Sequence, residues 1–251
     1  MGGAIIEGLL QGDEIARTDI TASDASQSAV ARFANSGVQI TTNNRAAVIN
    51  ADVIFVVVKP WLVEQVLADI KEVIDYDSQQ LVVVAAGIKS EQLREWLDKK
   101  GTILPTWLCI PNIAIAQKAS MTFLVEVAAT PPQTDGIKAL LDTMGHTMVI
   151  EEKLLGAATT LASCGIAYAM RYVRAASEGG VELGFKADVA KQIVMQTVKG
   201  AVELLEATNL HPEAAIDLVT TPGGVTIKGL NEMEHAGFTS SVIRGLKAGA
   251  K

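Results

Sequence analysis

The sequence predicts an α/β protein: a doubly wound parallel sheet followed by a domain built only of helices. Two observations carry this prediction. Up to about residue 152, strand-like and helix-like segments alternate, as they do when crossover helices join parallel strands. From Lys153 onward, apolar residues recur with the period of a helix. We therefore expect two domains, residues 1–152 and 153–251.

The first half contains short apolar segments, each followed by a helical one. The run DVIFVVV (52–58) is continuously apolar, which predicts a strand buried on both faces. Pro60 suits the first position of the next helix, and Ser90 is expected to cap the helix over 90–100. Further strands are expected over 19–23, 38–41, 80–86, 102–110, 121–127 and 146–152, and further helices up to residue 34, near 45–50 and over 132–144.

The second half contains long helices with few polar interruptions. One is expected over 168–184 and another over 186–207. Helices this apolar usually pack against many neighbours, often those of another subunit. The core of an ordinary helical bundle gives the same pattern, and the sequence does not separate the two. The stripe of the second helix consists of Ala190, Ile193, Val194, Thr197, Val198, Ala201, Leu204 and Leu205.

Composition excludes several classes of protein. The chain has 251 residues, a net charge of -7 and a pI near 5.1, which argues against a nucleic-acid partner. No apolar run is long enough for a membrane span, and the start does not resemble a signal peptide. Cys109 and Cys164 have no metal-ligand spacing, so we expect no metal site and a cytoplasmic protein.

The N-terminal segment looks like the first helix and second strand of a dinucleotide-binding, Rossmann-like fold. GGAIIEGLL (2–10) is followed by DITASD (19–24). In that fold a strand and a glycine-rich turn precede the helix, and here they do not. We expect this missing first strand to lie upstream of Met1, in an N-terminally truncated sequence. The alternative is a protein that begins with a helix.

Six motifs together resemble those of pyrroline-5-carboxylate reductase, across nearly the whole chain. They are MGGAIIEGLL, DVIFVVVKPWLV, VVVAAGI, IPNIAI, LASCGIAYAMRYVRAASEGGVELG and DLVTTPGGVTIKGLNEME, the last being the most specific. The resemblance implies NADP or NAD as cofactor and reduction of 1-pyrroline-5-carboxylate to L-proline, the last step of proline synthesis. It also implies that the helical domain is a dimerisation domain, in a homodimer or higher homo-oligomer.

The stretch TTPGGVT (220–226) interrupts the helices of the second half. Its glycines let backbone approach a ligand, and the unpaired N–H groups at the next helix start suit a carboxylate. The resemblance implies that Thr221, Gly223, Gly224, Val225 and Thr226 bind the substrate. It gives Thr226 the catalytic role of a hydrogen bond to the ring nitrogen. The alternative is that Thr226 only caps the helix.

The expected cofactor residues follow the strands of the first half. An acidic side chain at the end of the second strand favours the free 2′-hydroxyl of NADH, although Asp24 could equally cap the next helix. The alternative for Lys59 is an ordinary solvated lysine at a strand end. By resemblance the set is Ser23, Asp24 and Asn44 at the adenosine ribose, Val58, Lys59 and Pro60 at the adenosine or pyrophosphate, Ala86 and Gly87 at the nicotinamide ribose, and Pro111 and Asn112 at the nicotinamide.

The chemistry implied is hydride transfer to a cyclic imine. A protonated imine is already electrophilic, so the protein needs mainly to hold two rings face to face. None of His146, His211 and His235 is expected to be catalytic.

Two motifs depart from the family pattern. M-P-N-T-P becomes IPNIA, with Ile113 and Ala114, and S-G-S-G-P-A-Y becomes ASCGIAY, with Cys164 and Ile166. Two alternatives therefore stay open: a related imine or carbonyl reductase of another small carboxylated substrate, and a non-catalytic homologue.

Overall fold

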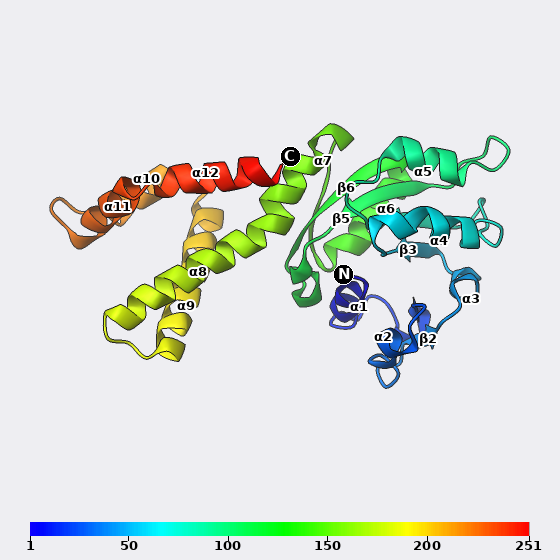
Figure 1. Ribbon diagram of the computed structural model, residues 1–251, viewed down its shortest axis with the longest axis horizontal. Coiled ribbons are helices and arrows are strands. Elements are labelled where there is room, and N and C mark those ends of the chain that lie inside the picture. Colours follow the sequence, from blue (N-terminus) through cyan, green and yellow to red (C-terminus); the bar gives the residue numbers. More distant parts are fainter. Residues whose placement is uncertain (251) are drawn as a thin grey trace. The chain divides into compact units, whose positions relative to one another are not determined.

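A computed structural model describes residues 1–250 of the chain. The chain forms two compact units, which divide between Ser163 and Cys164 (Figure 1). The first unit contains all the strands, and the second is helical. No helix among the described residues is long and apolar enough to cross a bilayer.

The first unit contains a five-stranded sheet and a separate two-stranded sheet. The strands are β1 (Thr21–Ser23), β2 (Gln39–Thr41), β3 (Val53–Val56), β4 (Gln80–Val83), β5 (Thr106–Ile110), β6 (Ser120–Ala128) and β7 (Gly145–Val149). The larger sheet has the order β3-β4-β5-β6-β7, and β1 pairs with β2. Every pairing is parallel except that of β5 with β6. The carboxyl ends of β3, β4 and β5 therefore meet at one edge.

Helices and 3₁₀ segments connect these strands. The helices are α1 (Gly2–Leu9), α2 (Gln27–Ala31), α3 (Asn44–Val48), α4 (Val63–Ile70), α5 (Ser90–Leu97), α6 (Pro131–Asp142) and α7 (Leu155–Ala158). The 3₁₀ segments are η1 (Arg17–Asp19), η2 (Pro60–Leu62), η3 (Ile113–Gln117) and η4 (Glu152–Leu154), and a π-helical turn, η5 (Thr159–Cys164), ends the unit.

Both faces of the larger sheet are covered, as the doubly wound prediction requires. Leu81 and Val83 of β4 join a core with residues of α3, α4, α5 and α7. Val82 and Val84 point to the opposite face and join a core with residues of α1, η3 and α6. This alternation of successive side chains confirms the α/β prediction and explains why the run from Leu81 to Val84 is apolar.

The prediction that the strand over 52–58 is buried on both faces was wrong. Ile54 and Val56 are buried on one face, whereas Val53 and Phe55 are only partly buried on the other. The reason is that β3 is an edge strand. It pairs with β4 on one side, and among the described residues no ladder joins it to β1.

Helix α1 contributes to the packing of both sheets. Its Ile5 lies in the core of the larger sheet, and Ile6 packs against the small core of β1, β2 and α2. Leu9 contacts both cores. Side-chain packing on α1 therefore links the two sheets, and among residues 1–250 no backbone ladder joins them.

The expectation that Ser90 caps α5 was also wrong. Lys89 holds the N-cap position, and the Gln92 side chain accepts a hydrogen bond from its N–H. Ser90 is the first helical residue, and its N–H donates 2.9 Å to Glu152, 62 positions away in sequence. A distant carboxylate thus occupies the positive end of this helix, which local sequence patterns could not indicate.

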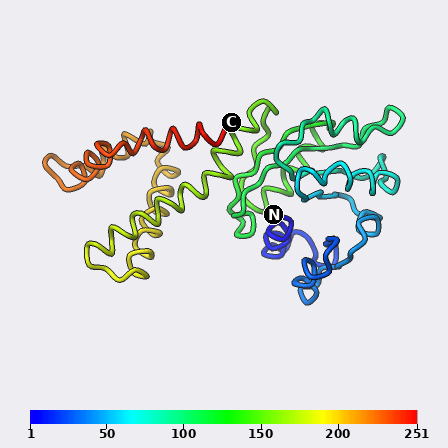
Figure 2. Tube along the Cα trace, in the orientation of Figure 1, coloured from blue at the N-terminus to red at the C-terminus, as the bar shows by residue number. Residues whose placement is uncertain are grey.

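The second unit is an all-helical assembly around a long hairpin. Its helices are α8 (Gly165–Glu182), α9 (Ala187–Thr208), α10 (Pro212–Leu218), α11 (Val225–His235) and α12 (Phe238–Gly249). The chain trace shows α8 and α9 side by side, and they are in extensive contact (Figure 2). Among residues 164–250, the buried apolar side chains are Ala190 and Ala215 alone.

Candidate active site

The expected cofactor residues lie at the carboxyl ends of successive parallel strands. Ser23 ends β1, and Asn44 begins the helix after β2. The three other groups follow β3, β4 and β5 in the order 58–60, 86–87 and 111–112. This edge is where open α/β sheets bind nucleotides. The fold therefore gathers onto sheet edges five segments that are far apart in sequence.

Ser23 and Asn44 are in direct contact. The Ser23 hydroxyl donates 2.8 Å to the Asn44 Oδ1 atom, which links the end of β1 to the start of α3. Both side chains are half-buried. The bond leaves the Asn44 amide N–H₂ group free to donate to a ligand.

Asp24 does not cap α2, so that alternative is wrong. The N-cap of α2 is Ser26, and the Asp24 Oδ1 atom accepts 2.8 Å from the Ser26 N–H in a turn that precedes the helix. One carboxylate oxygen is therefore held by local backbone. The side chain remains exposed, so its other oxygen faces water.

Sequence reasoning missed two neighbours of Asn44. Asn43, and not Asn44, caps α3, by accepting from the Ala46 N–H at 3.2 Å. Arg45 is exposed in the first turn of this helix and has no carboxylate within 4.0 Å among residues 1–250. The signal was present in TTNNR, where a cation directly follows the expected ribose contact.

The segment after β3 is a hydrogen-bonded turn that exposes Lys59. The Lys59 carbonyl accepts 2.9 Å from the Leu62 N–H, and Pro60 begins η2. Lys59 is exposed, while Val58 and Pro60 are half-buried. Val63, three residues after Pro60, is completely buried, which anchors the turn to the core.

The loop after β4 has a backbone that suits close approach of a ligand. Gly87 has φ +81°, a left-handed conformation that favours glycine. Ala86 and Gly87 are both exposed, although Ala85 and Ile88 on either side are buried. The loop therefore presents backbone and small groups at the strand ends, between two buried anchors.

The segment after β5 is a buried, hydrogen-bonded turn. The Asn112 N–H donates 3.1 Å to the Ser120 hydroxyl, and the Asn112 Oδ1 atom accepts 3.0 Å from the Ala114 N–H. The Pro111 carbonyl accepts from Ser163 of η5 at 3.3 Å. Sequence reasoning missed Ser163. Beside this turn, Ile113 is 64% exposed.

The expected substrate loop is a tight turn in the second unit. The Gly224 N–H donates 2.9 Å to the Thr221 carbonyl, and Gly223 has φ +71°. Proline second and glycine third is the pattern of a type II turn. A Cβ atom on Gly224 would lie 2.5 Å from the Thr221 Oγ1 atom, so this position also requires glycine. The conformation of the turn therefore explains why both of these positions are glycine.

Thr226 is not the N-cap of α11, so the capping alternative is wrong. Gly224 holds that position, Val225 is the first helical residue, and Thr226 is the second. Among the described residues, no side chain caps this helix start. The first N–H groups and the exposed Thr226 hydroxyl are therefore available to a ligand.

The remaining reactive groups do not join these sets. Burial raises the pKa of the Cys109 thiol to about 12, so Cys109 is not a nucleophile. His146 lies on β7, His211 caps α10 through its own ring nitrogen, and His235 ends α11. Among residues 1–250 no three acidic, histidine or cysteine side chains cluster as metal ligands would.

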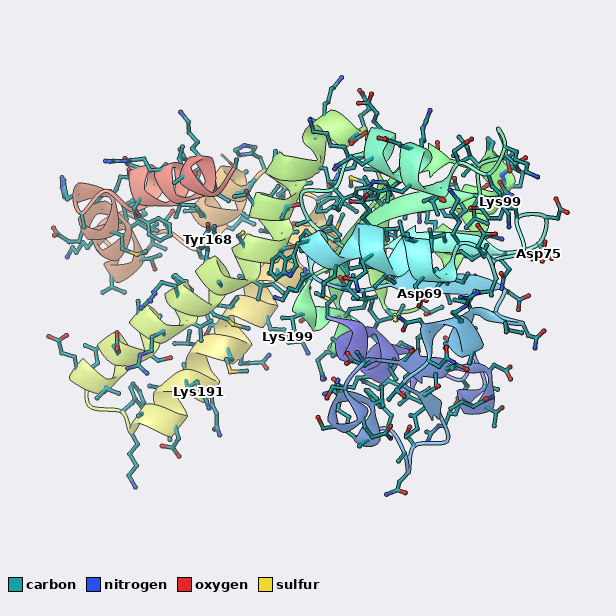
Figure 3. The ribbon with its side chains drawn as sticks, turned by 45° about the vertical axis from the view of Figure 1, so that its right-hand side comes forward. Asp69, Asp75, Lys99, Tyr168, Lys191 and Lys199 are labelled. Carbon is teal, nitrogen blue, oxygen red and sulfur yellow. The ribbon has the colours of Figure 1, made fainter. Side chains whose placement is uncertain are left out.

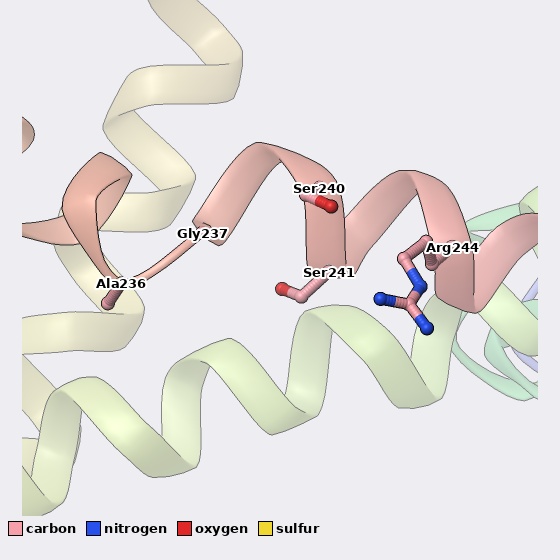
Figure 4. Close-up of a pocket in the computed structure, with 5 residues that line it drawn as sticks. All are labelled: Ala236, Gly237, Ser240, Ser241 and Arg244. Carbon is pink, nitrogen blue, oxygen red and sulfur yellow. The ribbon is translucent and has the colours of Figure 1, made fainter.

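A hollow lies beside the start of α12. It is lined by Ala236, Gly237, Ser240, Ser241 and Arg244 (Figure 4). None of these residues belongs to the expected substrate or cofactor sets. The expected substrate loop precedes α11, whereas this hollow follows it.

Two protein families match parts of the chain. The family described as "Pyrroline-5-carboxylate reductase dimerisation" matches residues 152–251. The family described as "NADP oxidoreductase coenzyme F420-dependent" matches residues 1–87. The first of these matches indicates that the helical half takes part in a homo-oligomer.

Individual relatives match over nearly the whole chain. Pyrroline-5-carboxylate reductase 1 of Dictyostelium discoideum is 35% identical over 98% of this chain, which spans only 46% of that protein. Pyrroline-5-carboxylate reductase of Pisum sativum is 32% identical over 100% of this chain and 90% of its own length. The crystal structure of Plasmodium falciparum pyrroline carboxylate reductase with NADP bound superposes with a TM-score of 0.88, covering 100% of this chain and 92% of that one at 22% identity.

Proposed function

The chain belongs to the pyrroline-5-carboxylate reductase family, and on that premise we propose that it reduces 1-pyrroline-5-carboxylate to L-proline with NADPH or NADH. A hydride adds to the carbon of the protonated C=N bond, the π electrons become the lone pair of the ring nitrogen, and that nitrogen keeps its N–H bond. The reduced nicotinamide supplies the hydride.

The turn that begins α11 is the observation that carries the proposal. Its first N–H groups are uncapped, and Gly223 and Gly224 keep side chains away from them. A helix start of this kind binds a carboxylate without a cation. The Thr226 hydroxyl lies one residue beyond the first helical N–H, where it would accept a hydrogen bond from the protonated ring nitrogen.

The residues at the strand ends fit a nicotinamide dinucleotide. The donors there are the Asn44 amide and the Lys59 ammonium group, which suit hydroxyl and phosphate oxygens. Ala86 and Gly87 leave the backbone after β4 accessible to a ligand, and hydrogen bonds hold Asn112, next to Pro111, in place. We propose that these residues, with Ser23, Asp24, Val58 and Pro60, hold the cofactor.

Two wider features belong to the same proposal. We propose that residues 1–152 bind the cofactor and that residues 153–251 form the subunit interface and bind the substrate, in a homodimer or a larger assembly. A reducing compartment such as the cytoplasm is proposed because Cys109 and Cys164 are both free thiols.

The test is a substrate panel with both cofactors. The purified chain is incubated with NADPH or NADH and with pyrroline-5-carboxylate, pyrroline-2-carboxylate or a cyclic imine lacking a carboxylate. We expect loss of nicotinamide absorbance and formation of L-proline with the first substrate only. A faster reaction with another carboxylated imine would favour the related reductase, for which the exposed Ile113 is the specific observation. Failure to form any product with either cofactor would contradict the enzyme proposal.

A further inference from the structure

The most exposed large apolar side chain in the first unit is that of Trp61. Its side chain is 75% exposed. Trp107 is fully buried and donates its indole N–H to Thr134, and Trp96 packs against the core of the larger sheet. Burial of a tryptophan is strongly favourable, so exposure of one ring out of three calls for a specific reason.

The backbone that carries Trp61 is held rigidly. Trp61 is the second residue of η2, between the Lys59 carbonyl and the Leu62 N–H that close the turn at 2.9 Å. Pro60 fixes the preceding φ angle. Val63 and Leu67 follow and are completely buried. The ring is thus exposed on an anchored backbone, which lowers the entropy cost of packing a ligand against it.

Trp61 lies where the adenosine half of a dinucleotide is expected to bind. It follows β3 at the carboxyl edge of the larger sheet, in the same turn as Lys59. Lys59 has no carboxylate within 4.0 Å among residues 1–250, so the turn offers a free cation and a flat ring two positions apart. A phosphate and a purine base are the groups that such a pair recognises. The expected nicotinamide contacts lie two strands away, after β5.

We propose that Trp61 is the stacking platform for the adenine ring of the nicotinamide dinucleotide. This inference rests on the proposed function for the identity of the cofactor. The matched dimerisation region begins at residue 152 and does not include this turn, so the exposed ring lies outside that interface region.

Intrinsic tryptophan fluorescence tests the contact directly. The whole chain is titrated with AMP, with 2′,5′-ADP and with nicotinamide mononucleotide. Stacking on Trp61 quenches emission with the two adenine nucleotides and not with nicotinamide mononucleotide. Trp96→Phe, which removes a core-packed ring, keeps this quenching, and Trp61→Phe abolishes it. Quenching that survives in Trp61→Phe, or that is absent from the unsubstituted chain, overturns the proposal.

Affinity separates stacking from simple apolar contact. Trp61→Phe retains a ring, whereas Trp61→Leu retains apolar area without one. We expect Kd for NADPH, measured by calorimetry, to rise roughly tenfold in Trp61→Leu and in Trp61→Ala and much less in Trp61→Phe. Melting temperature stays unchanged in all three, because the ring is exposed. Equal Kd values in the four proteins overturn the proposal.

Two parallel measurements keep the outcomes distinct. Turnover of pyrroline-5-carboxylate by the unsubstituted chain reports on the proposed function alone. Intact turnover, without quenching of tryptophan fluorescence by adenine nucleotides, therefore contradicts only the role of Trp61. Light scattering of Trp61→Ala tests the alternative that the ring packs against a second copy of the chain. A smaller assembly in that variant, with unchanged Kd, overturns the adenine contact.

Discussion

The position of Thr226 within α11 determines the expected effect of its substitution on activity and on stability. Because Gly224 and not Thr226 holds the N-cap position of α11, removal of the Thr226 hydroxyl costs no helix cap. If the hydroxyl contacts the charged imine, its loss removes about 1.5–3 kcal/mol of binding. We therefore expect Thr226→Ala to lower kcat/KM about tenfold or more while melting temperature is unchanged.

The matched control for this experiment is Thr226→Ser, which keeps the hydroxyl and deletes a methyl group. We expect it to retain most of the activity. A large fall in melting temperature for Thr226→Ala with unchanged kinetics would show that the hydroxyl serves the fold and not the substrate.

A second prediction at the scale of one residue concerns Arg45. One oxygen of Asp24 is engaged by the Ser26 N–H, while Arg45 stands exposed and without an ion pair among residues 1–250. A free guanidinium beside Asn44 suits a phosphate better than a hydroxyl. We expect Arg45→Ala to raise KM for NADPH several-fold and to leave KM for NADH nearly unchanged, as measured by steady-state kinetics with each cofactor.

Arg45→Lys is the control for charge without the planar group, and its KM for NADPH should lie between those of the unsubstituted chain and Arg45→Ala. Equal changes in KM for both cofactors would place Arg45 away from the 2′-position. In that case Asp24 would be left as the residue that decides between the two cofactors.

At the scale of elements, α6 and β7 are joined by Asp142. Its Oδ1 atom accepts 2.7 Å from the Thr147 N–H, and Lys138 pairs with its other oxygen. Burial acts to raise the pKa of Asp142, but the hydrogen bonds from Lys138 and Thr147 outweigh it and hold the pKa below the ordinary value of an aspartate. The carboxylate thus stabilises the fold above the unfolded-state pKa, and this contribution is lost as pH falls through the lower folded value.

We expect Asp142→Asn to remove part of the acid dependence of stability. Urea unfolding at neutral pH and at pH values below 3.8 should show a smaller loss of stability in the variant than in the unsubstituted chain. Asp135→Asn, an exposed carboxylate on the same helix, is the control. The effect is modest because the Asp142 side chain is one-third exposed. Identical pH profiles for the two variants would contradict this role.

Elements with a strong local pattern were predictable from sequence, and those set by distant contacts were not. The β4 run and the helix that becomes α9 follow from apolar spacing. Glu152 at the start of α5 and Ser163 on the Pro111 carbonyl come from positions 62 and 52 residues away. No local rule indicates such partners. Likewise, the half-buried face of β3 depends on which strand lies next to it, and a run of valines does not encode that.

The candidate site divides in the same way. The turn at Thr221–Gly224 could be predicted from the sequence because proline fixes φ and glycine permits a positive φ. The cap of α11 was misread by two positions because glycine caps without a side chain. Trp61 was missed as a single residue because exposure of one ring depends on tertiary structure.

At the scale of the whole molecule, the second unit leaves much of its apolar surface exposed. Besides two buried alanines, its apolar side chains are at least partly exposed, and Leu183, Leu218 and Met170 are 83%, 66% and 63% exposed. Figure 3 shows Tyr168 on α8 and Lys191 and Lys199 on α9. Such a surface is typical of an interface that another subunit covers.

We expect the chain to be a dimer or larger at micromolar concentration by light scattering. Ile193→Glu places a charge within the apolar stripe of α9, where the side chain is 45% exposed, and should shift the protein toward monomer. Lys191→Glu introduces the same side chain two positions away and should not. A stable monomer of the unsubstituted chain would refute the interface.

The separate sheets of the first unit carry a consequence for solvent exchange. Asp52 and Val56 carbonyls accept from β4, so in this parallel register the intervening amides of Val53 and Phe55 face the opposite edge. No strand pairs with that edge among residues 1–250. Deuterium should therefore label Val53 and Phe55 well before Ile54, although all three residues belong to one strand. If a molecule added to the chain slows deuterium exchange at the Val53 and Phe55 amides, that molecule pairs with this edge of β3. The exchange rate of each amide then shows which residues are paired.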